Sequence, residues 1–237
     1  MGLFLYKNMK VNKLIYDVRE VLKQYMNDSD IDDRYILYLY GIKRAKYLRQ
    51  ELNNFQRTTD ITITQTLCLE LEEVSVLQCG IDLDCETIVR TKQPIPKPLE
   101  LHLKSAITSV RPVKRISPSF NFINKEKAIF SKYSPFKNGI YAFLDNDMHI
   151  YLLSELDTIK LIDCITITGI FEDPLELLNY LNCCGCEEPT KCFDLDESDY
   201  PLQPHYIDLI KNEIVNELVN KLKIPEDTEN NSDNDEK

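Results

Sequence analysis

The sequence predicts an α+β protein in which helical segments flank a β-rich middle. Apolar residues recur at helical spacing in residues 11–54 and again in residues 204–223. Residues 58–172 instead show the two-residue alternation of strands, without an intervening helical pattern. This order favours an antiparallel sheet folded into a small sandwich or barrel. We divide the chain into an N-terminal helical hairpin (1–57), a β-rich domain (58–172), a C-terminal helical region with a cysteine-rich loop (173–224) and a disordered acidic tail (225–237).

Two helices are predicted at the N-terminal end, over residues 11–26 and 28–54. Only a short polar loop joins them, so we expect them to pack as an antiparallel hairpin. Ser29 or Asp30 serves as the N-cap of the second helix, with an aspartate three residues later in each case. The residues expected to form the buried stripe of the second helix are Ile31, Tyr35, Tyr38, Leu39, Ile42, Ala45, Leu48 and Leu52.

The second half of this helix carries four basic residues, Lys43, Arg44, Lys46 and Arg49, on a chain whose formal net charge is −11. The charge is unevenly distributed: residues 155–237 hold 21 acidic and 6 basic side chains, whereas residues 1–154 hold 18 and 22. Such asymmetry suits contact between the basic half of one copy and the acidic half of another. We therefore predict an interface that includes these four bases together with Ile207 and Ile214 of the last helix.

The β-rich middle begins with residues 61–71, in which five odd positions are apolar: Ile61, Ile63, Leu67, Leu69 and Leu71. Val74 and Val76 reverse this parity, which predicts a bulge at residues 72–73. Residues 93–99 contain alternating prolines and must be extended. Further strands are expected at residues 86–91, 106–110, 127–133 and 158–170, with a hairpin at 138–153 that turns at Asp145-Asn146-Asp147.

Helical structure is predicted to return at Asp173-Pro174, an N-cap followed by proline, in a short helix that ends near Leu181. An amphipathic helix then runs to about Lys223, where Pro225 stops it. The tail beyond residue 225 lacks a long apolar stretch, so we expect it to be disordered.

The cysteines have the most specific spacing in the chain. One group lies within ten residues and a second pair precedes it by about a hundred: Cys183, Cys184, Cys186 and Cys192, then Cys79 and Cys85. A C-x-x-C pair with two further thiolates could hold structural zinc, but a second C-x-x-C is missing. Free thiols, zinc and disulfides all stay open, and reducing cytosol favours free thiols.

No pattern in the sequence indicates an enzyme or a bound cofactor. His102, His149 and His205 have no metal-ligand spacing, and a glycine-rich phosphate loop is absent. There is no apolar run of about 18 residues for a membrane span. The first residues do not match a signal peptide, and either Met1 or Met9 could be the natural start.

Five segments carry strings typical of one family: KLIYDVREVLKQYMNDSDIDDRYILYLYGIKRAKYLRQELN, ITQTLCLELEEV, TKQPIPKPLELH, NCCGCEEPTKCF and YPLQPHYIDLIKNEIVNEL. On these segments the sequence resembles a virion structural protein of the crAss-like tailed bacteriophages, of the ring type at the head–tail junction. The resemblance covers nearly the whole chain.

The resemblance implies a non-enzymatic ring, a dodecamer that matches the portal, which stacks between portal and tail and lines the DNA channel. Its partners would be the portal protein and neighbouring tail or ring proteins, with DNA only as passing cargo and no membrane. The protein would be made in the host cytoplasm and reside in the virion. From the residues alone, a zinc-stabilised protein-binding module is the alternative, and a hydrolase with an unrecognised triad ranks below both.

Overall fold

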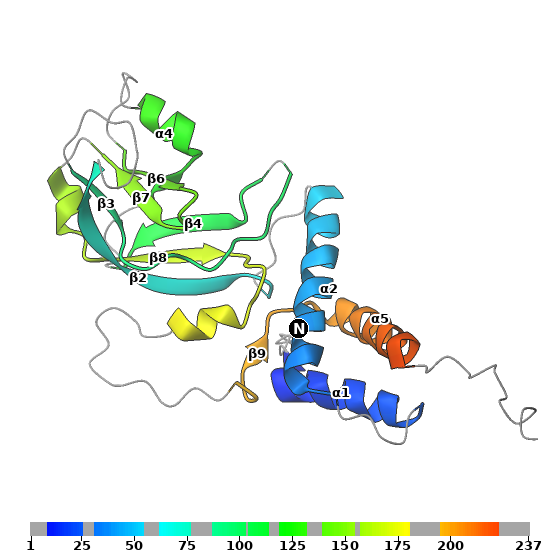
Figure 1. Ribbon diagram of the computed structural model, residues 1–237. Coiled ribbons are helices and arrows are strands. Elements are labelled where there is room, and N and C mark those ends of the chain that lie inside the picture. The colour runs from blue at the N-terminus through cyan, green and yellow to red at the C-terminus, as the bar shows by residue number, and fades with distance from the viewer. Residues whose placement is uncertain are drawn as a thin grey trace, which may run out of the picture.

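Helix α2 (Asp33–Asn54) joins the two parts of the fold, a helical layer and a barrel-like β-sheet (Figure 1). The computed structural model describes residues 9–25, 31–54, 62–76, 87–102, 104–113, 119–131, 139–154, 157–180 and 195–222. Its other helices are α1 (Val11–Lys23), α4 (Lys125–Ser131) and α5 (Pro204–Leu222), with short 3₁₀ helices η1 (Asp157–Leu161) and η2 (Glu176–Tyr180). The α+β class predicted from the sequence is confirmed.

The sheet contains seven strands in the order β4-β8-β2-β3-β7-β6-β5. These are β2 (Gln65–Ser75), β3 (Thr87–Thr91), β4 (Ile107–Pro112), β5 (Asn121–Phe122), β6 (Tyr141–Leu144), β7 (Ile150–Leu153) and β8 (Cys164–Gly169). Neighbours are antiparallel except for β5 and β6. A bridge between Val110 and Phe120 brings the two edge strands together, so the sheet is a nearly closed barrel. A separate two-stranded sheet pairs β1 (Met9–Lys10) with β9 (Asp199–Tyr200).

Strand β2 supplies side chains to two different cores. Its odd residues Leu67 and Leu69 lie inside the barrel with apolar residues of β3, β4, β6, β7 and β8. Its register with β3 shows no shift from Leu71 to Ser75, so the predicted bulge at residues 72–73 is wrong. The reversed parity instead directs Val74 and Val76 to the opposite face of the sheet. There they meet an outer core of Ile88, Ala128, Phe143 and Tyr151 beneath α4.

The helical layer has its own core, built from α1, the first half of α2, α5 and β9. Helix α5 packs against both α1 and α2. In Figure 1, α1 lies across the lower end of α2, so the predicted antiparallel packing of the two helices is not confirmed. The second half of α2 leaves this core and packs against the barrel. The residues of α2 and of the barrel that meet there form the junction core: Ala45, Leu48, Leu52, Ile63, Leu99, Ala106 and Ile170.

The predicted buried stripe of α2 is only partly correct. Leu39, Ala45, Leu48 and Leu52 are buried as expected, but Tyr35, Tyr38 and Ile42 are exposed. Ile36, Leu37 and Tyr40 take their place in the helical core. Residues 35–40 are all apolar or aromatic, so helical spacing alone could not choose which face is buried.

Several predicted elements are confirmed and two are corrected. The strand at 86–91 and the hairpin at 138–153 correspond to β3 and to β6–β7. Residues 127–133 were predicted as a strand, but α4 occupies most of them, with Ala128 N–H donating to the carbonyl oxygen of Asn124. The strand predicted at 158–170 begins only at Cys164, because η1 precedes it. The predictions for the cysteine-rich loop and the acidic tail fall outside the described residues, and the domain boundaries stay predictions.

Candidate assembly interface

Arg44 is buried completely, although the sequence predicted it to lie on a basic surface. Its guanidinium donates hydrogen bonds to the backbone carbonyl oxygens of Pro201 at 2.7 Å and Phe171 at 2.8 Å, with Ile63 at 3.4 Å. Burial lowers the pKa of the guanidinium, yet arginine stays protonated because its ordinary pKa is so high. Arg44 therefore binds α2 to three separate segments of its own chain.

The neighbouring lysines bind helix α5. Lys43 Nζ lies 2.9 Å from Glu217 Oε2 and 3.6 Å from Glu213 Oε2, and Lys46 Nζ lies 3.1 Å from Glu213 Oε1. Tyr47 also donates its hydroxyl hydrogen bond to Glu213. Hydrogen bonds from Lys221 and then Lys43 lower the pKa of Glu217 to about 2. The α2–α5 seam thus pairs basic and acidic halves of the sequence within one chain.

Arg49 forms an ion pair with Glu172, which also lies 3.3 Å from Lys97 Nζ. The two apolar members of the predicted interface, Ile207 and Ile214, are buried in the helical core. Of the six predicted residues, Lys46 and Arg49 expose the most side chain, at 48% and 39%. The structure therefore brings the four bases onto one helix but turns them to different partners. Their contact with another copy stays a prediction.

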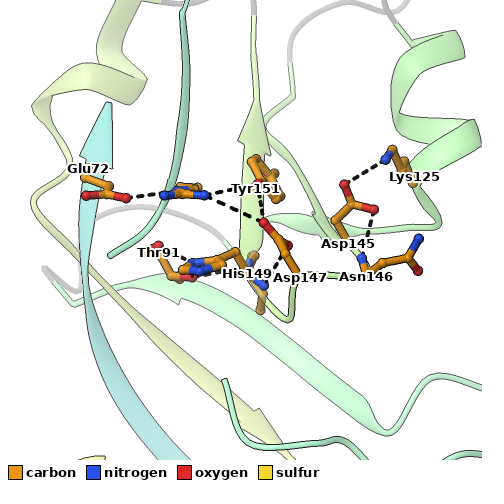
Figure 2. Close-up of polar contacts among 10 residues, drawn as sticks. Glu72, Thr91, Lys125, Asp145, Asn146, Asp147, His149 and Tyr151 are labelled. Carbon is orange, nitrogen blue, oxygen red and sulfur yellow. Dashed lines mark hydrogen bonds and ion pairs between the residues drawn. The ribbon is translucent and has the colours of Figure 1, made fainter. Parts of the chain in front are cut away.

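A polar network surrounds the turn between β6 and β7 (Figure 2). Arg90 Nε donates to Glu72 at 2.9 Å, and its Nη1 reaches toward the hydroxyl of Tyr151 and the carboxylate of Asp147. Tyr151 donates its hydroxyl hydrogen bond to Asp147 at 2.6 Å. The hydrogen bonds that Arg90 donates to Tyr151 and to Glu72 raise the pKa of Arg90, against the opposing effect of burial.

The same turn is fixed from its other side. His149 Nδ1 lies 2.6 Å from the carbonyl oxygen of Thr91, so Nδ1 carries the proton and donates it. Lys125 binds Asp145 at 2.7 Å, and Met148 adopts a positive φ of 60°. Figure 2 shows the contact between Lys125 and Asp145 on one side of the turn and the contact between His149 and Thr91 on the other. The network holds a hairpin. The Thr91 hydroxyl lies 3.4 Å from His149 Nδ1, but Nδ1 carries a proton and so cannot accept one from this hydroxyl.

The described residues contain no group of three or more histidine, cysteine or acidic side chains able to hold a metal. The three histidines belong to separate elements, with His102 near α2 and His205 against Tyr206 on α5. Cys68 and Cys164, both on strands of the sheet, are half-buried. The other six cysteines lie outside the described ranges, so zinc binding by them stays a prediction. No helix in those ranges is both long and apolar enough to cross a membrane.

An apolar groove runs along α2 on the face that the sequence expected to be buried. We call it the α2 groove; it has a volume of about 570 Å³. Tyr38 is 62% exposed and Ile42 46% exposed, and Tyr35 stacks on Tyr38 with ring centroids 6.3 Å apart. The lining residues are Arg34, Leu37, Tyr38, Gly41, Ile42, Ala45, Arg49, Glu172, Asp173, Leu175 and Leu195.

Comparison with known proteins identifies the family of the chain. A family model described as phage tail ring protein 2 matches residues 13–236. The chain belongs to this family. It is also similar to Ring protein 2 of Bacteroides phage crAss001, with 24% identity over 228 residues, 96% of this chain and 98% of that protein. The ring-type resemblance seen in the sequence is confirmed, and membership of this family indicates a phage structural protein of the virion that assembles with others.

The α2–α5 seam and the α2 groove differ in that the seam lies within one chain, whereas the groove is exposed. Glu213, Glu217 and Tyr47 complete the basic cluster within the chain and were missed by sequence reasoning. Glu213 and Glu217 are spaced i, i+4 on the last helix, and Lys43 and Lys46 are spaced i, i+3 on α2, so each pair lies on one helix face. The α2 groove was missed because its residues were assigned to the core. Aromatic and aliphatic residues at helical spacing could have indicated either a buried core face or an exposed contact surface.

Proposed function

We propose that this chain forms a closed ring in the head–tail connector of a tailed phage, between portal and tail, and that the ring lines the channel through which DNA passes. The observation that carries the proposal is the family match, which spans residues 13–236 and describes a tail ring protein. A closed ring of identical subunits matched to the portal would be a dodecamer, and its partners would be the portal and neighbouring tail or ring proteins.

The charge of the chain supports a channel role. A net charge of −11 disfavours tight binding to DNA, because affinity rises with the number of phosphates that lysine and arginine neutralise. The α2–α5 seam uses Lys43 and Lys46 to neutralise carboxylates of the same chain. DNA could therefore slide through such a ring as cargo without being held.

We further propose that the ring is non-enzymatic. The polar network at the β6–β7 turn fixes a hairpin, and Arg44 holds backbone carbonyls, so the main polar clusters of the described residues serve the fold. The interface proposal is narrowed to the exposed members of the basic set, Lys46 and Arg49, at the α2 surface.

Cryo-electron microscopy of intact particles tests this function. The expected result is density for this fold in a closed ring at the head–tail junction, with its inner surface toward the DNA and twelve-fold symmetry. A chain located away from that junction, or present as isolated copies, would refute the connector role while leaving the family assignment intact.

A further inference from the structure

We propose that the α2 groove receives part of a second copy of this chain, and so forms one side of the contact between neighbours in the ring. The inference rests on the proposed function, because ring assembly supplies the neighbouring copy. It adds the surface by which one subunit recognises the next.

The groove contains apolar side chains that the described part of the chain leaves exposed. Tyr38 and Ile42 lie one helical turn apart on α2, and Leu195 faces them from the segment before β9. All three belong to one contiguous lining. A continuous apolar patch bordered by charges is typical of protein contact surfaces.

Gly41 is an independent indication that something packs closely against α2 here. It lies in the middle of the helix, where glycine is a poor choice. A Cβ added at Gly41 would meet no atom of the described residues within 4 Å, so packing against those residues does not require glycine. Gly41 lines the groove, and the missing side chain lets a neighbouring molecule approach the helix.

The rim identifies the occupant as protein. Arg34 and Asp173 are exposed at the groove, and neither side chain forms an ion pair with another described residue. Glu172 adds a second carboxylate. Nucleic acid would be repelled by these acids and would gain nothing from the apolar floor, whereas a protein surface with both charges matches. In a ring of identical subunits each heterologous interface joins two copies.

Gly41→Leu tests the proposal without disturbing the fold. The new side chain would enter open space and leucine is a better helix former than glycine, so the melting temperature should stay equal or rise. The matched control is Asn216→Leu, which places the same side chain on an exposed position of α5 outside the groove. Both changes are introduced into the phage that encodes the chain, and copies per purified particle are counted by mass spectrometry.

We expect Gly41→Leu to lower the copy number per particle at least about tenfold. Blocking a central contact lowers the affinity between two copies by about that factor or more. Asn216→Leu should match the unmodified chain. A Gly41→Leu chain that fills the ring normally would overturn the groove assignment, although the connector role would stand. Absence of a ring in unmodified particles would instead refute the proposed function.

A photo-crosslinking residue at Ile42 identifies the occupant directly. Particles are assembled from a mixture of ¹⁴N- and ¹⁵N-labelled chain and then irradiated. Crosslinked peptides that combine both isotopes and both come from this chain support the inference. Crosslinks only to another structural protein, or only within one labelled chain, overturn it.

Discussion

Arg44→Lys probes whether the buried guanidinium, rather than its charge, holds the helical layer to the barrel. Arginine offers five N–H donors in a planar fork and reaches the carbonyl oxygens of Pro201 and Phe171 at the same time. Lysine keeps the charge but can reach one of them at best. It would also bury a strongly hydrated ammonium at a fully buried position where no described carboxylate forms an ion pair with residue 44.

The magnitude follows from the two short hydrogen bonds. Each hydrogen bond from a charged donor contributes about 1.5–3 kcal/mol, and a buried carbonyl left without a donor adds to the loss. We expect Arg44→Lys to lower the free energy of unfolding by about 3–5 kcal/mol. In a chain of this length that corresponds to a fall in melting temperature of roughly 6–20 °C.

Thermal and urea denaturation followed by circular dichroism measure the effect. Arg34→Lys is the matched control, because Arg34 is exposed on the same helix and forms no ion pair among the described residues; its change should stay within about 0.5 kcal/mol. If Arg44→Lys were as mild as this control, the guanidinium would not be the anchor described above, and Arg44 would behave as an ordinary surface base.

Three further perturbations test other parts of the structure. Glu217→Gln should make stability depend less on pH in acid. The pKa of Glu217 is lowered to about 2, so its contribution to stability is complete above the unfolded pKa near 4.5 and is lost as pH falls toward 2. An unchanged stability profile in acid titration by circular dichroism would contradict the α2–α5 seam. Lys43→Glu should destabilise the α2–α5 seam by about 1–2 kcal/mol in a salt-dependent manner, and adding Glu217→Lys should restore most of the loss in denaturation experiments; no rescue would argue against direct pairing. Phe143→Ala should cost about 3–5 kcal/mol, because the ring is fully buried and stacks on Tyr151; a loss below about 1 kcal/mol would show that the outer core is loosely packed.

Local patterns predicted those elements whose residues alternate in type. In β2, Leu67, Leu69 and Leu71 occupy alternate positions, and the β6–β7 turn carries consecutive aspartate and asparagine residues, so both could be located from the sequence. Residues 35–40 contain no polar position, and spacing therefore could not decide which face of α2 is buried. That choice was made by α1 and α5, which pack from distant parts of the chain.

The candidate interface shows the same limit for charge. Counting acids and bases predicted that the basic helix would meet an acidic segment, and we assigned that segment to a neighbouring copy. It could not reveal that Glu213 and Glu217 come from the same chain, because that depends on how α5 packs against α2. Arg44 was still less accessible to prediction, since its partners are carbonyl groups that every residue possesses. Backbone acceptors leave no signature in the sequence.

Helix α2 has one half in the helical core and the other half in the junction core, with Arg44 between them. A helix of 22 residues is about 33 Å long and stiff along its axis. A force on its exposed face near Tyr38 would therefore be transmitted along the helix to the barrel, because the helix is continuous between the two cores. Strain at a subunit contact would be shared by both layers, and the chain would bear mechanical load as a single rigid body.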